Sequence, residues 1–542
     1  MSNSLNLLLV AFALVFLDIL IFRFGIIYPK NTTILKIPHL TQAEDAMFKE
    51  YPQYDAIGLA QLIKAGDISA KQALEAAIFQ ANKRNPKLNA IIHRFDERAF
   101  AAAQQGLPNG VFSGVPYLLK DLNFLFAGEP LKMGSRSVNI TPEQDSELVR
   151  RMRATGVNTF GKTNTPEFGL IITTEPKSFG PTHNPFKKGY SSGGSSGGSA
   201  AAVSAGIVPM AGAGDGGGSI RFPAAWCGVF GLKPSRGRNP SGPLYAEGWE
   251  GAVVDHVITR SVRDSAAMLD ATAGREVGSA FVTEVSAKDS FLQATKQPSK
   301  PLKIAIMREP LFPGTILDKE VLAVLDKTCQ QLEDMGHTLD YAQPRINIDS
   351  MWRDFFTVVC AHTAFFVDDL AQRHGIQQVA NLEPQTRNMA MIGRSLSVLD
   401  LLKAKQGWHD VQYQTGLVLE QYDMILCPTV PTPAVKHGVL PPSRIDELLL
   451  SVTDVIERGI NVGKWIYNSS LVEKLSAPVL SKMAFTTLGN VTGLPCMSLP
   501  MGISSKGLPI GMQVIGRMND EAGLFSLAAD IERAGLFTEP AI

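Results

Sequence analysis

The chain has 542 residues, of which 45% are hydrophobic and 19% charged, a composition typical of a folded globular protein and too apolar for a disordered one. Lysine plus arginine and aspartate plus glutamate both number 51, so no net charge favours binding to a nucleic acid. The five cysteines and nine histidines are scattered without the spacing of zinc ligands, and we therefore expect no metal and no other cofactor.

Residues 1–28 form an N-terminal hydrophobic segment. Residues 7–27 are apolar apart from Asp18 and Arg23, which is close to the roughly 20 residues needed to cross a bilayer. A signal peptide would require a basic residue before this run, and none is present. We therefore predict an apolar helix that anchors a single-pass membrane protein, with a signal peptide or an interfacial helix as alternatives. The basic residues follow the segment, which by the positive-inside rule leaves the rest of the chain on the cytoplasmic side.

Residues 40–540 are predicted to form one α/β domain. Ser69-Ala-Lys-Gln72 has the pattern of a capping box, and apolar residues recur at helical spacing from Leu74 to Ala81, so a helix begins there and ends at Asn85-Pro86. Short β-like runs then alternate with helical stretches, at 114–119, 159–160, 302–306, 424–426 and 511–515. This alternation predicts a sheet with helices on both faces.

Glycine and serine crowd both ends of the stretch 189–234, around an alanine-rich middle. A flexible linker would expose that apolar middle, and a phosphate-binding loop would need a GxxxxGK[ST] or GxGxxG pattern that is missing. Gly216, Gly217 and Gly218 let successive backbone N–H groups approach one point, and Ser219 follows directly. The pattern indicates an oxyanion hole, formed by these glycines and Ser219, beside a serine nucleophile.

The same stretch, with GGSSGGSAAAV and GAGDGGGSIRFPAAWCGVFGLKP, resembles the signature of the amidase signature family. The resemblance runs from about Tyr54 to Asp530 and includes GVPYLLKD at 114–121 and GKTNTPEF at 161–168. It implies a serine amidohydrolase with a single large catalytic domain, built on a central mixed β-sheet with helices on both faces.

Carried over residue by residue, the resemblance implies that Ser219 is the nucleophile, Ser195 a bridging serine and Lys120 the general base. The family holds the bridging serine behind a cis peptide, here Gly194-Ser195. A lysine acts as a base only when it is neutral, so we expect Lys120 to be buried with a lowered pKa rather than paired at the surface with Asp121.

The loop and the substrate pocket are predicted with less support from the sequence. Asp215 and Arg221 flank the nucleophile and are expected to orient its loop. One candidate wall of the pocket consists of residues at helical spacing, which could equally be plain core: Trp352, Phe355, Phe356, Cys360 and His362.

The expected substrate is a small-molecule amide. Gly231–Arg238, followed by Gly242-Pro243, resembles the branch that holds 6-aminohexanoate cyclic dimer hydrolases, so a small or oligomeric amide, linear or cyclic, is expected to yield an acid plus an amine or ammonia. The N-terminal segment leaves a lipid amide open. Two alternatives are the glutaminase (A) subunit of glutamyl-tRNA amidotransferase and an inactive binding protein with the amidase fold. The sequence also leaves open whether the chain forms a homodimer.

Overall fold

The β-like runs of the sequence become strands of one large sheet. The computed structural model describes residues 48–243, 245–283, 290–440, 462–467 and 477–542. Its strands are β1 Ile91–Arg94, β2 Pro116–Lys120, β3 Asn158–Thr163, β4 Met210–Asp215, β5 Phe230–Lys233, β6 Val254–Thr259, β7 Lys303–Ile306, β8 Thr338–Tyr341, β9 Met424–Pro428, β10 Cys496–Ile503 and β11 Pro509–Ile515. All five predicted runs are confirmed, as β2, β3, β7, β9 and β11.

In the described part of the chain these strands form a single eleven-stranded sheet in the order β1-β3-β2-β4-β6-β5-β10-β11-β9-β7-β8. The sheet is mixed: β2 is parallel to β3 and β4, and β7 is parallel to β8 and β9, whereas the other pairs are antiparallel. The parallel group around β2 matters for function, because the carboxyl ends of neighbouring parallel strands meet at one edge of a sheet.

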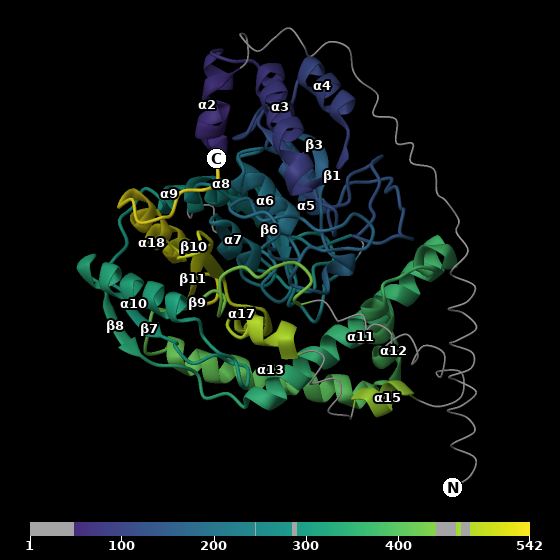
Figure 1. Cartoon of the computed structure of the whole chain (residues 1–542), viewed down its shortest axis with the longest axis vertical. Coiled ribbons are helices and arrows are strands. Elements are labelled where there is room, and N and C mark those ends of the chain that lie inside the picture. Colours follow the sequence, from purple (N-terminus) through teal and green to yellow (C-terminus); the bar gives the residue numbers. More distant parts are fainter. Residues whose placement is uncertain (1–47, 244, 284–289, 441–461, 468–476) are drawn as a thin grey trace. The chain divides into compact units, whose positions relative to one another are not determined.

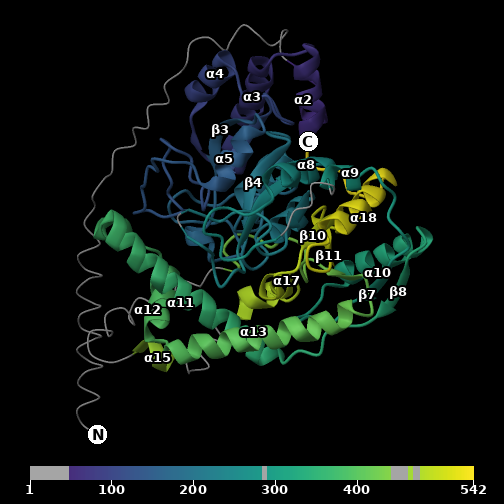
Figure 2. The same cartoon turned by 180° about the vertical axis from the view of Figure 1, so that it is seen from behind.

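Helices make up about half of the remaining described structure. The α-helices are α2 Ala56–Ala65, α3 Ala70–Leu88, α4 Asp96–Gln105, α5 Glu147–Ala154, α6 Gly197–Ser204, α7 Arg221–Cys227, α8 Val262–Thr272, α9 Phe291–Ala294, α10 Lys319–Asp334, α11 Ile348–His374, α12 Pro384–Ser395, α13 Val398–Leu419, α15 Val462–Tyr467, α17 Thr486–Thr492 and α18 Glu521–Arg533. Short 3-10 helices are η1 Tyr51–Gln53, η2 Glu167–Gly169, η3 Ile376–Val379 and η4 Ser481–Met483. Figures 1 and 2 show α11, α12 and α13 lying together, away from α2, α3 and α4.

Strand β9 shows how the helices cover both faces of the sheet. Met424 and Leu426 pack in one apolar cluster with residues of α10 and α18. Ile425 and Cys427, which point to the opposite face, pack in another cluster with residues of α11, α13 and α17. The prediction of an α/β fold with helices on both faces is therefore confirmed.

Helix α3 begins as the sequence predicts and ends later. The Ser69 side chain accepts from Gln72 N, the Gln72 side chain accepts from Ser69 N, and the capping box is confirmed. The helix then continues through Pro86 to Leu88 and ends at Asn89, whose φ is 53° and whose N–H donates to Asn85 O. Pro86 has no N–H and so donates no hydrogen bond in the last turn, but the residues after it keep the helical conformation.

The predictions for the N-terminus are corrected. In the described ranges, from residue 48 onward, no helix has the length and apolarity to cross a membrane. The predicted transmembrane helix and membrane location are corrected accordingly, and the predicted membrane association and apolar N-terminal helix have no support. These predictions used the hydropathy of residues 7–27 and the basic residues around them, although Asp18 lies in that run at a cost of a few kcal/mol in a bilayer. The whole segment 1–28 lies outside the described residues.

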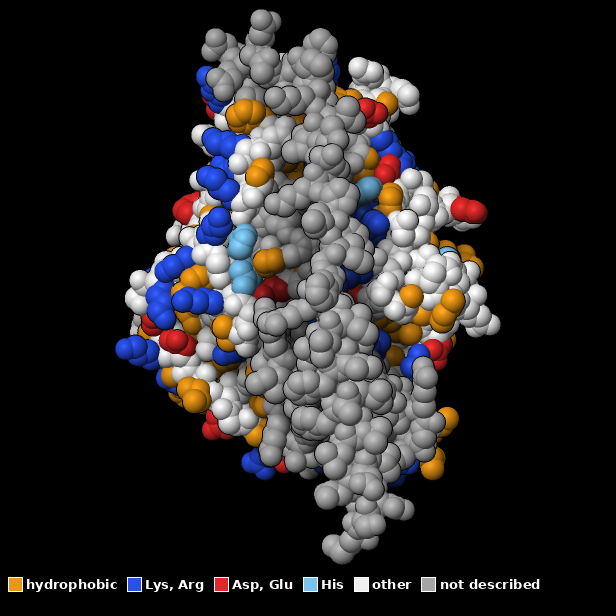
Figure 3. Space-filling model, turned by 45° about the vertical axis from the view of Figure 1, so that its right-hand side comes forward, with side chains coloured by type: hydrophobic (Ala, Val, Ile, Leu, Met, Phe, Trp, Pro, Cys, Tyr) orange, Lys and Arg blue, Asp and Glu red, His pale blue; other side chains and the backbone are white. Residues whose placement is uncertain are grey.

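Acidic and basic side chains are intermixed on the surface. On the face drawn in Figure 3, the described Lys, Arg, Asp and Glu side chains are interspersed with hydrophobic and polar ones. Several form exposed ion pairs, such as Arg150 with Glu147 at 2.7 Å and Arg308 with Asp326 at 2.8 Å. Because an exposed pair typically contributes under about 1 kcal/mol, the buried clusters on both faces of the sheet carry the stability of the fold.

Candidate active site

The ends of two parallel strands bring the predicted catalytic residues together. Leu118 of β2 pairs with Ala211 of β4, and Lys120 and Asp215 are the last residues of these two strands. Ser219 lies in the turn between β4 and α7, and Ser195 lies just before α6. The sheet register therefore places all of them at one edge.

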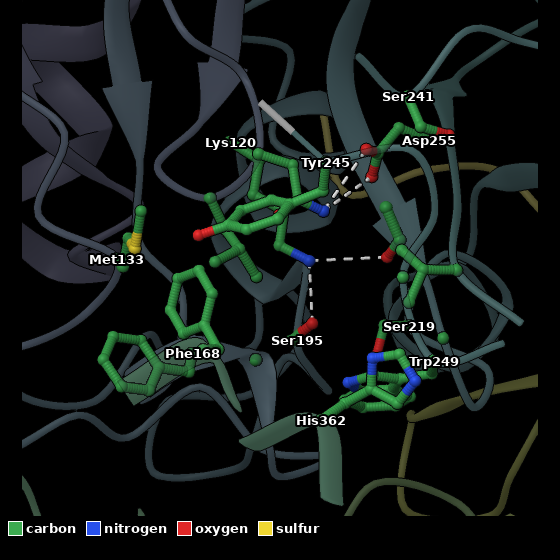
Figure 4. A pocket seen from close by; sticks show the side chains of 18 of the residues that line it. Lys120, Met133, Phe168, Ser195, Ser219, Ser241, Tyr245, Trp249, Asp255 and His362 are labelled. Carbon is green, nitrogen blue, oxygen red and sulfur yellow. Dashed lines mark hydrogen bonds between the residues drawn. The ribbon is translucent and has the colours of Figure 1, made fainter. Parts of the chain in front are cut away.

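Lys120 contacts Ser195 directly. The two atoms Nζ and Oγ are 2.7 Å apart, and Nζ also lies 3.4 Å from Gly214 O (Figure 4). The peptide bond Gly194-Ser195 is cis, as the resemblance implies. Ser219 lies beside this pair, because the N–H of the residue after Ser195 donates to Ser219 O at 3.3 Å. The side chains of Lys120, Ser195 and Ser219 all line one pocket.

Burial dominates the electrostatics of Lys120. The side chain is 1% exposed, and burial lowers its pKa from 10.5 to about 8, although the nearby Asp255 and Asp215 carboxylates act in the opposite direction. Asp121 does not pair with it: the Asp121 carboxylate lies 3.7 Å from the ammonium of the buried Lys162. The surface ion pair considered from the sequence is thus absent at Lys120, within the residues that the structure describes.

Asp215 and Arg221 hold the loop that carries Ser219. Arg221 Nε and Nη2 each donate to the Asp215 carboxylate at 2.9 Å. The other N–H groups of the guanidinium donate to Thr486 O, Gln513 Oε1 and Asn490 Oδ1 at 2.6 to 2.8 Å. Burial alone would raise the pKa of Asp215, but Arg221 outweighs it and the pKa is lowered. The pair is fully buried, so the loop is fixed by a completely hydrogen-bonded ion pair.

The glycine turn supplies fewer donors than the sequence suggested. Gly218 N donates to Asp215 Oδ1 at 2.7 Å, so this predicted member of the oxyanion hole has its N–H already occupied. In the described ranges the N–H groups of Gly216, Gly217 and Ser219 donate to no protein acceptor. Gly218 instead has a conformational role, because its φ is 122°.

Asp255 is a residue of the site that sequence reasoning missed. It lies opposite Gly214 in the β4–β6 ladder, where a β-carbon on Gly214 would collide with its carboxylate. Asn123 Nδ2 lies 3.2 and 3.3 Å from its two oxygens. Burial raises its pKa to about 6, and the neighbouring Lys120 acts against that shift. The sequence gives only a weak indication of Asp255, because it is a single aspartate next to His256 in the otherwise apolar run Ala252–Ile258.

The pocket has an apolar wall and a polar wall. The apolar wall includes Leu122, Leu131, Met133, Phe168 and Phe366. The polar wall comes from residues 241–243 and 245–250, which lie in no helix or strand. They contribute Ser241, Tyr245 and Trp249, which Figure 4 shows, and Glu247. Two contacts tie this segment to α11: Tyr245 Oη donates to Asp369 at 3.0 Å, and Glu250 lies 3.3 Å from His362 Nε2. Sequence analysis did not single out this segment.

Helix α11 lines the pocket, but mostly with other residues than those predicted. Trp352, Phe355 and Cys360 are buried in the core cluster, and Phe356 packs against that cluster. Of the candidate wall, His362 lines the pocket, together with three residues further along the helix: Thr363, Phe365 and Phe366.

Comparison with known proteins gives the family. A match to the amidase family covers residues 72–525. The chain is 33% identical over 494 residues to a 6-aminohexanoate-cyclic-dimer hydrolase of Pseudomonas sp. (strain NK87), which covers 89% of this chain and 94% of the relative.

Solved structures agree with this assignment. A 6-aminohexanoate cyclic dimer hydrolase complexed with substrate is similar with a TM-score of 0.80 at 31% identity, covering 91% of this chain and 98% of that one. A bacterial aryl acylamidase of the amidase signature family is similar with a TM-score of 0.76 at 25% identity, covering 90% and 98%. This chain therefore belongs to the amidase signature family and is a hydrolase that acts on amides.

Proposed function

We propose that the chain hydrolyses a carboxylic amide to an acid and an amine or ammonia through an acyl-enzyme on Ser219. The observation that carries this proposal is the 2.7 Å contact between the buried Lys120 amine and Ser195 Oγ, in the pocket that Ser219 also lines. A serine hydroxyl is a weak nucleophile until a base takes its proton. A buried lysine with a pKa of about 8 has a substantial neutral fraction near neutral pH and can act as that base.

In the acylation step, Ser219 Oγ attacks the amide carbonyl while its proton passes to Ser195, and the Ser195 proton passes to the neutral Lys120. The oxygen of the tetrahedral intermediate accepts from N–H groups of the glycine turn, of which Gly216, Gly217 and Ser219 are unoccupied in the described structure. The proton then returns by the same route to the departing nitrogen, because an amide anion is too poor a leaving group.

Water completes the cycle. It attacks the acyl-serine carbonyl, gives a proton to the Ser195–Lys120 pair, and the intermediate collapses to release the acid and to restore the Ser219 hydroxyl. The turn that carries Ser219 must keep the same geometry during acylation and deacylation. The Asp215–Arg221 pair supports this requirement, since it holds both ends of the turn that carries Ser219.

The described pocket offers a glutaminase no partner for the α-carboxylate of glutamine, although its carboxylates suit the α-ammonium. Free glutamine carries an α-carboxylate, which in a buried site needs a cationic partner. Among the described residues that line the pocket, Lys120 is the only lysine or arginine, and the proposed mechanism requires it to be neutral. Glu247 and Asp255 line the same pocket and would repel a carboxylate.

A panel of short aliphatic, aryl and cyclic amides, assayed with the wild type and Ser219→Ala, tests the proposal. Ser219→Ala should abolish turnover of every substrate, and Lys120→Ala should retain a small activity that rises with pH. A fluorophosphonate should label Ser219, as seen by mass spectrometry of the intact protein, and Ser241→Ala should still be labelled. Undiminished hydrolysis by Ser219→Ala would refute the acyl-enzyme, and a folded wild type that no fluorophosphonate labels would favour the inactive binding protein.

A further inference from the structure

The polar wall of the pocket contains a carboxylate without a counter-charge of its own. Glu247 lines the pocket, and neither of its oxygens receives a hydrogen bond within the described residues. One of them, Oε2, has no surface accessible to solvent. An ionised carboxylate withdrawn from water is costly unless a donor or a cation meets it.

The cationic side chains and the histidine near Glu247 contact other groups. Lys405 Nζ lies 2.6 Å from Glu250, and His362 Nε2 lies 3.3 Å from the same carboxylate. Arg236 donates to backbone carbonyls, with Nε 2.9 Å from Gly251 O and Nη2 directed at the end of α17. Glu250 is therefore the carboxylate that pairs with Lys405, whereas Glu247 lines the cavity without a paired cation among the described residues.

The excess of negative charge in the pocket is larger when Lys120 is neutral, which is the form in which it acts as the base. Asp215 is neutralised by Arg221 at 2.9 Å. Asp255, however, has Lys120 as its neighbouring cation, and the base must be neutral before Ser219 attacks. In that form the uncompensated charges that line the described pocket, Asp255 and Glu247, are both negative. A pocket of this kind attracts a cation and repels an anion.

We propose that Glu247 selects amides that carry a cationic nitrogen, such as an alkylammonium group separated from the scissile amide by an apolar chain. The ammonium would donate to the Glu247 carboxylate, and the chain would lie against the apolar wall of Leu122, Leu131, Met133 and Phe168. This inference rests on the proposed function, because it assigns the substrate class of the same pocket.

The test uses 4-nitroanilides of three acids of equal chain length, which end in an ammonium (6-aminohexanoic), a methyl (heptanoic) and a carboxylate (adipic). A second series places the same three end groups on the amine side of the amide. At about pH 8.5 an alkylamine is still mostly charged. In at least one series, kcat/KM should be about tenfold higher for the ammonium than for the methyl substrate, and lowest for the carboxylate.

Glu247→Gln keeps the size of the side chain and should remove the tenfold preference for the ammonium over the methyl substrate. Glu97→Gln is the matched control, since Glu97 is exposed on α4, and it should keep the full preference. Equal rates for the ammonium and methyl substrates in both series, or a preference that persists in Glu247→Gln, would overturn the inference.

A binding measurement separates this inference from the proposed mechanism. Hexylammonium should raise the melting temperature of the wild type more than 1-hexanol or hexanoate at equal concentration, and should lose that advantage in Glu247→Gln. If hydrolysis depends on Ser219 but hexylammonium has no advantage over 1-hexanol, the charge selection is wrong and the mechanism stands. If hexylammonium binds as expected but hydrolysis does not depend on Ser219, the mechanism fails and the assignment of Glu247 stands.

Discussion

The lowered pKa of Lys120 predicts a specific dependence of rate on pH. A lysine of pKa 10.5 is neutral in only about one molecule in three thousand at pH 7, whereas one of pKa about 8 is neutral in about one in ten. Burial therefore raises the fraction of active base by about 300-fold, which corresponds to roughly 3 kcal/mol. We expect kcat/KM for a neutral amide to rise about tenfold per pH unit below pH 8 and to level off above it.

Asp255→Asn tests the cause of this behaviour. The Asp255 carboxylate opposes the effect of burial, so its removal should lower the pKa of Lys120 further and move the midpoint of the profile to lower pH, by about one unit. Asp121→Asn is the control: this buried aspartate follows Lys120 in sequence but pairs with Lys162, and its removal should leave the midpoint in place. Thermal unfolding of each variant checks that it is folded.

The measurement is a series of initial rates between pH 5.5 and 10.5 with hexanoyl 4-nitroanilide, whose charge does not change in that range. A profile that rises only above about pH 10 would show an ordinary lysine and would refute the argument from burial. So would a midpoint that moves upward in Asp255→Asn.

Three further predictions concern the loop and the pocket. Asp215→Asn leaves Arg221 buried without its counter-ion. It should lower the free energy of unfolding by about 3 to 5 kcal/mol in a denaturant titration and abolish turnover. An unchanged denaturation midpoint would contradict the role of the pair. Gly218→Ala adds a β-carbon only 2.5 Å from a neighbouring threonine at a φ of 122° and should reduce kcat at least about tenfold, whereas Gly189→Ala, at a φ of 86° in open space, should keep kcat and lose about 1 kcal/mol of stability. His362→Gln should keep kcat within a few-fold and leave the midpoint of the pH profile unchanged; a loss as large as that of Lys120→Ala would make the histidine the base.

The sequence predicts those parts of the site that depend on a continuous motif. Lys120, Ser195 and Ser219 lie in continuous stretches that resemble the family signature, and the resemblance implies their roles. The resemblance of the same stretches also implies the Gly194-Ser195 cis bond, and Asp215 and Arg221 flank Ser219 in the sequence.

The missed parts of the site come together through tertiary contacts. Asp255 reaches the site through its cross-strand register with Gly214, and no local pattern reports that register. Glu247 lies in a segment without helical or strand periodicity, so nothing distinguished it from an ordinary loop residue. On α11, the predicted residues around Cys360 are buried in the core cluster, whereas the residues that line the cavity are His362, Thr363, Phe365 and Phe366. Hydrophobic spacing alone identifies a buried face and not the partner that buries it.

The guanidinium of Arg221 ties the catalytic turn to the far end of the polypeptide. Its partners Thr486 and Gln513 lie 265 and 292 residues further along the chain. A nascent chain, or a fragment cut before α17, would therefore contain every proposed catalytic residue and still lack the groups that complete the turn. Such a fragment should be inert until the C-terminal piece is supplied, so separately expressed halves of this protein could report their own association by regaining hydrolysis.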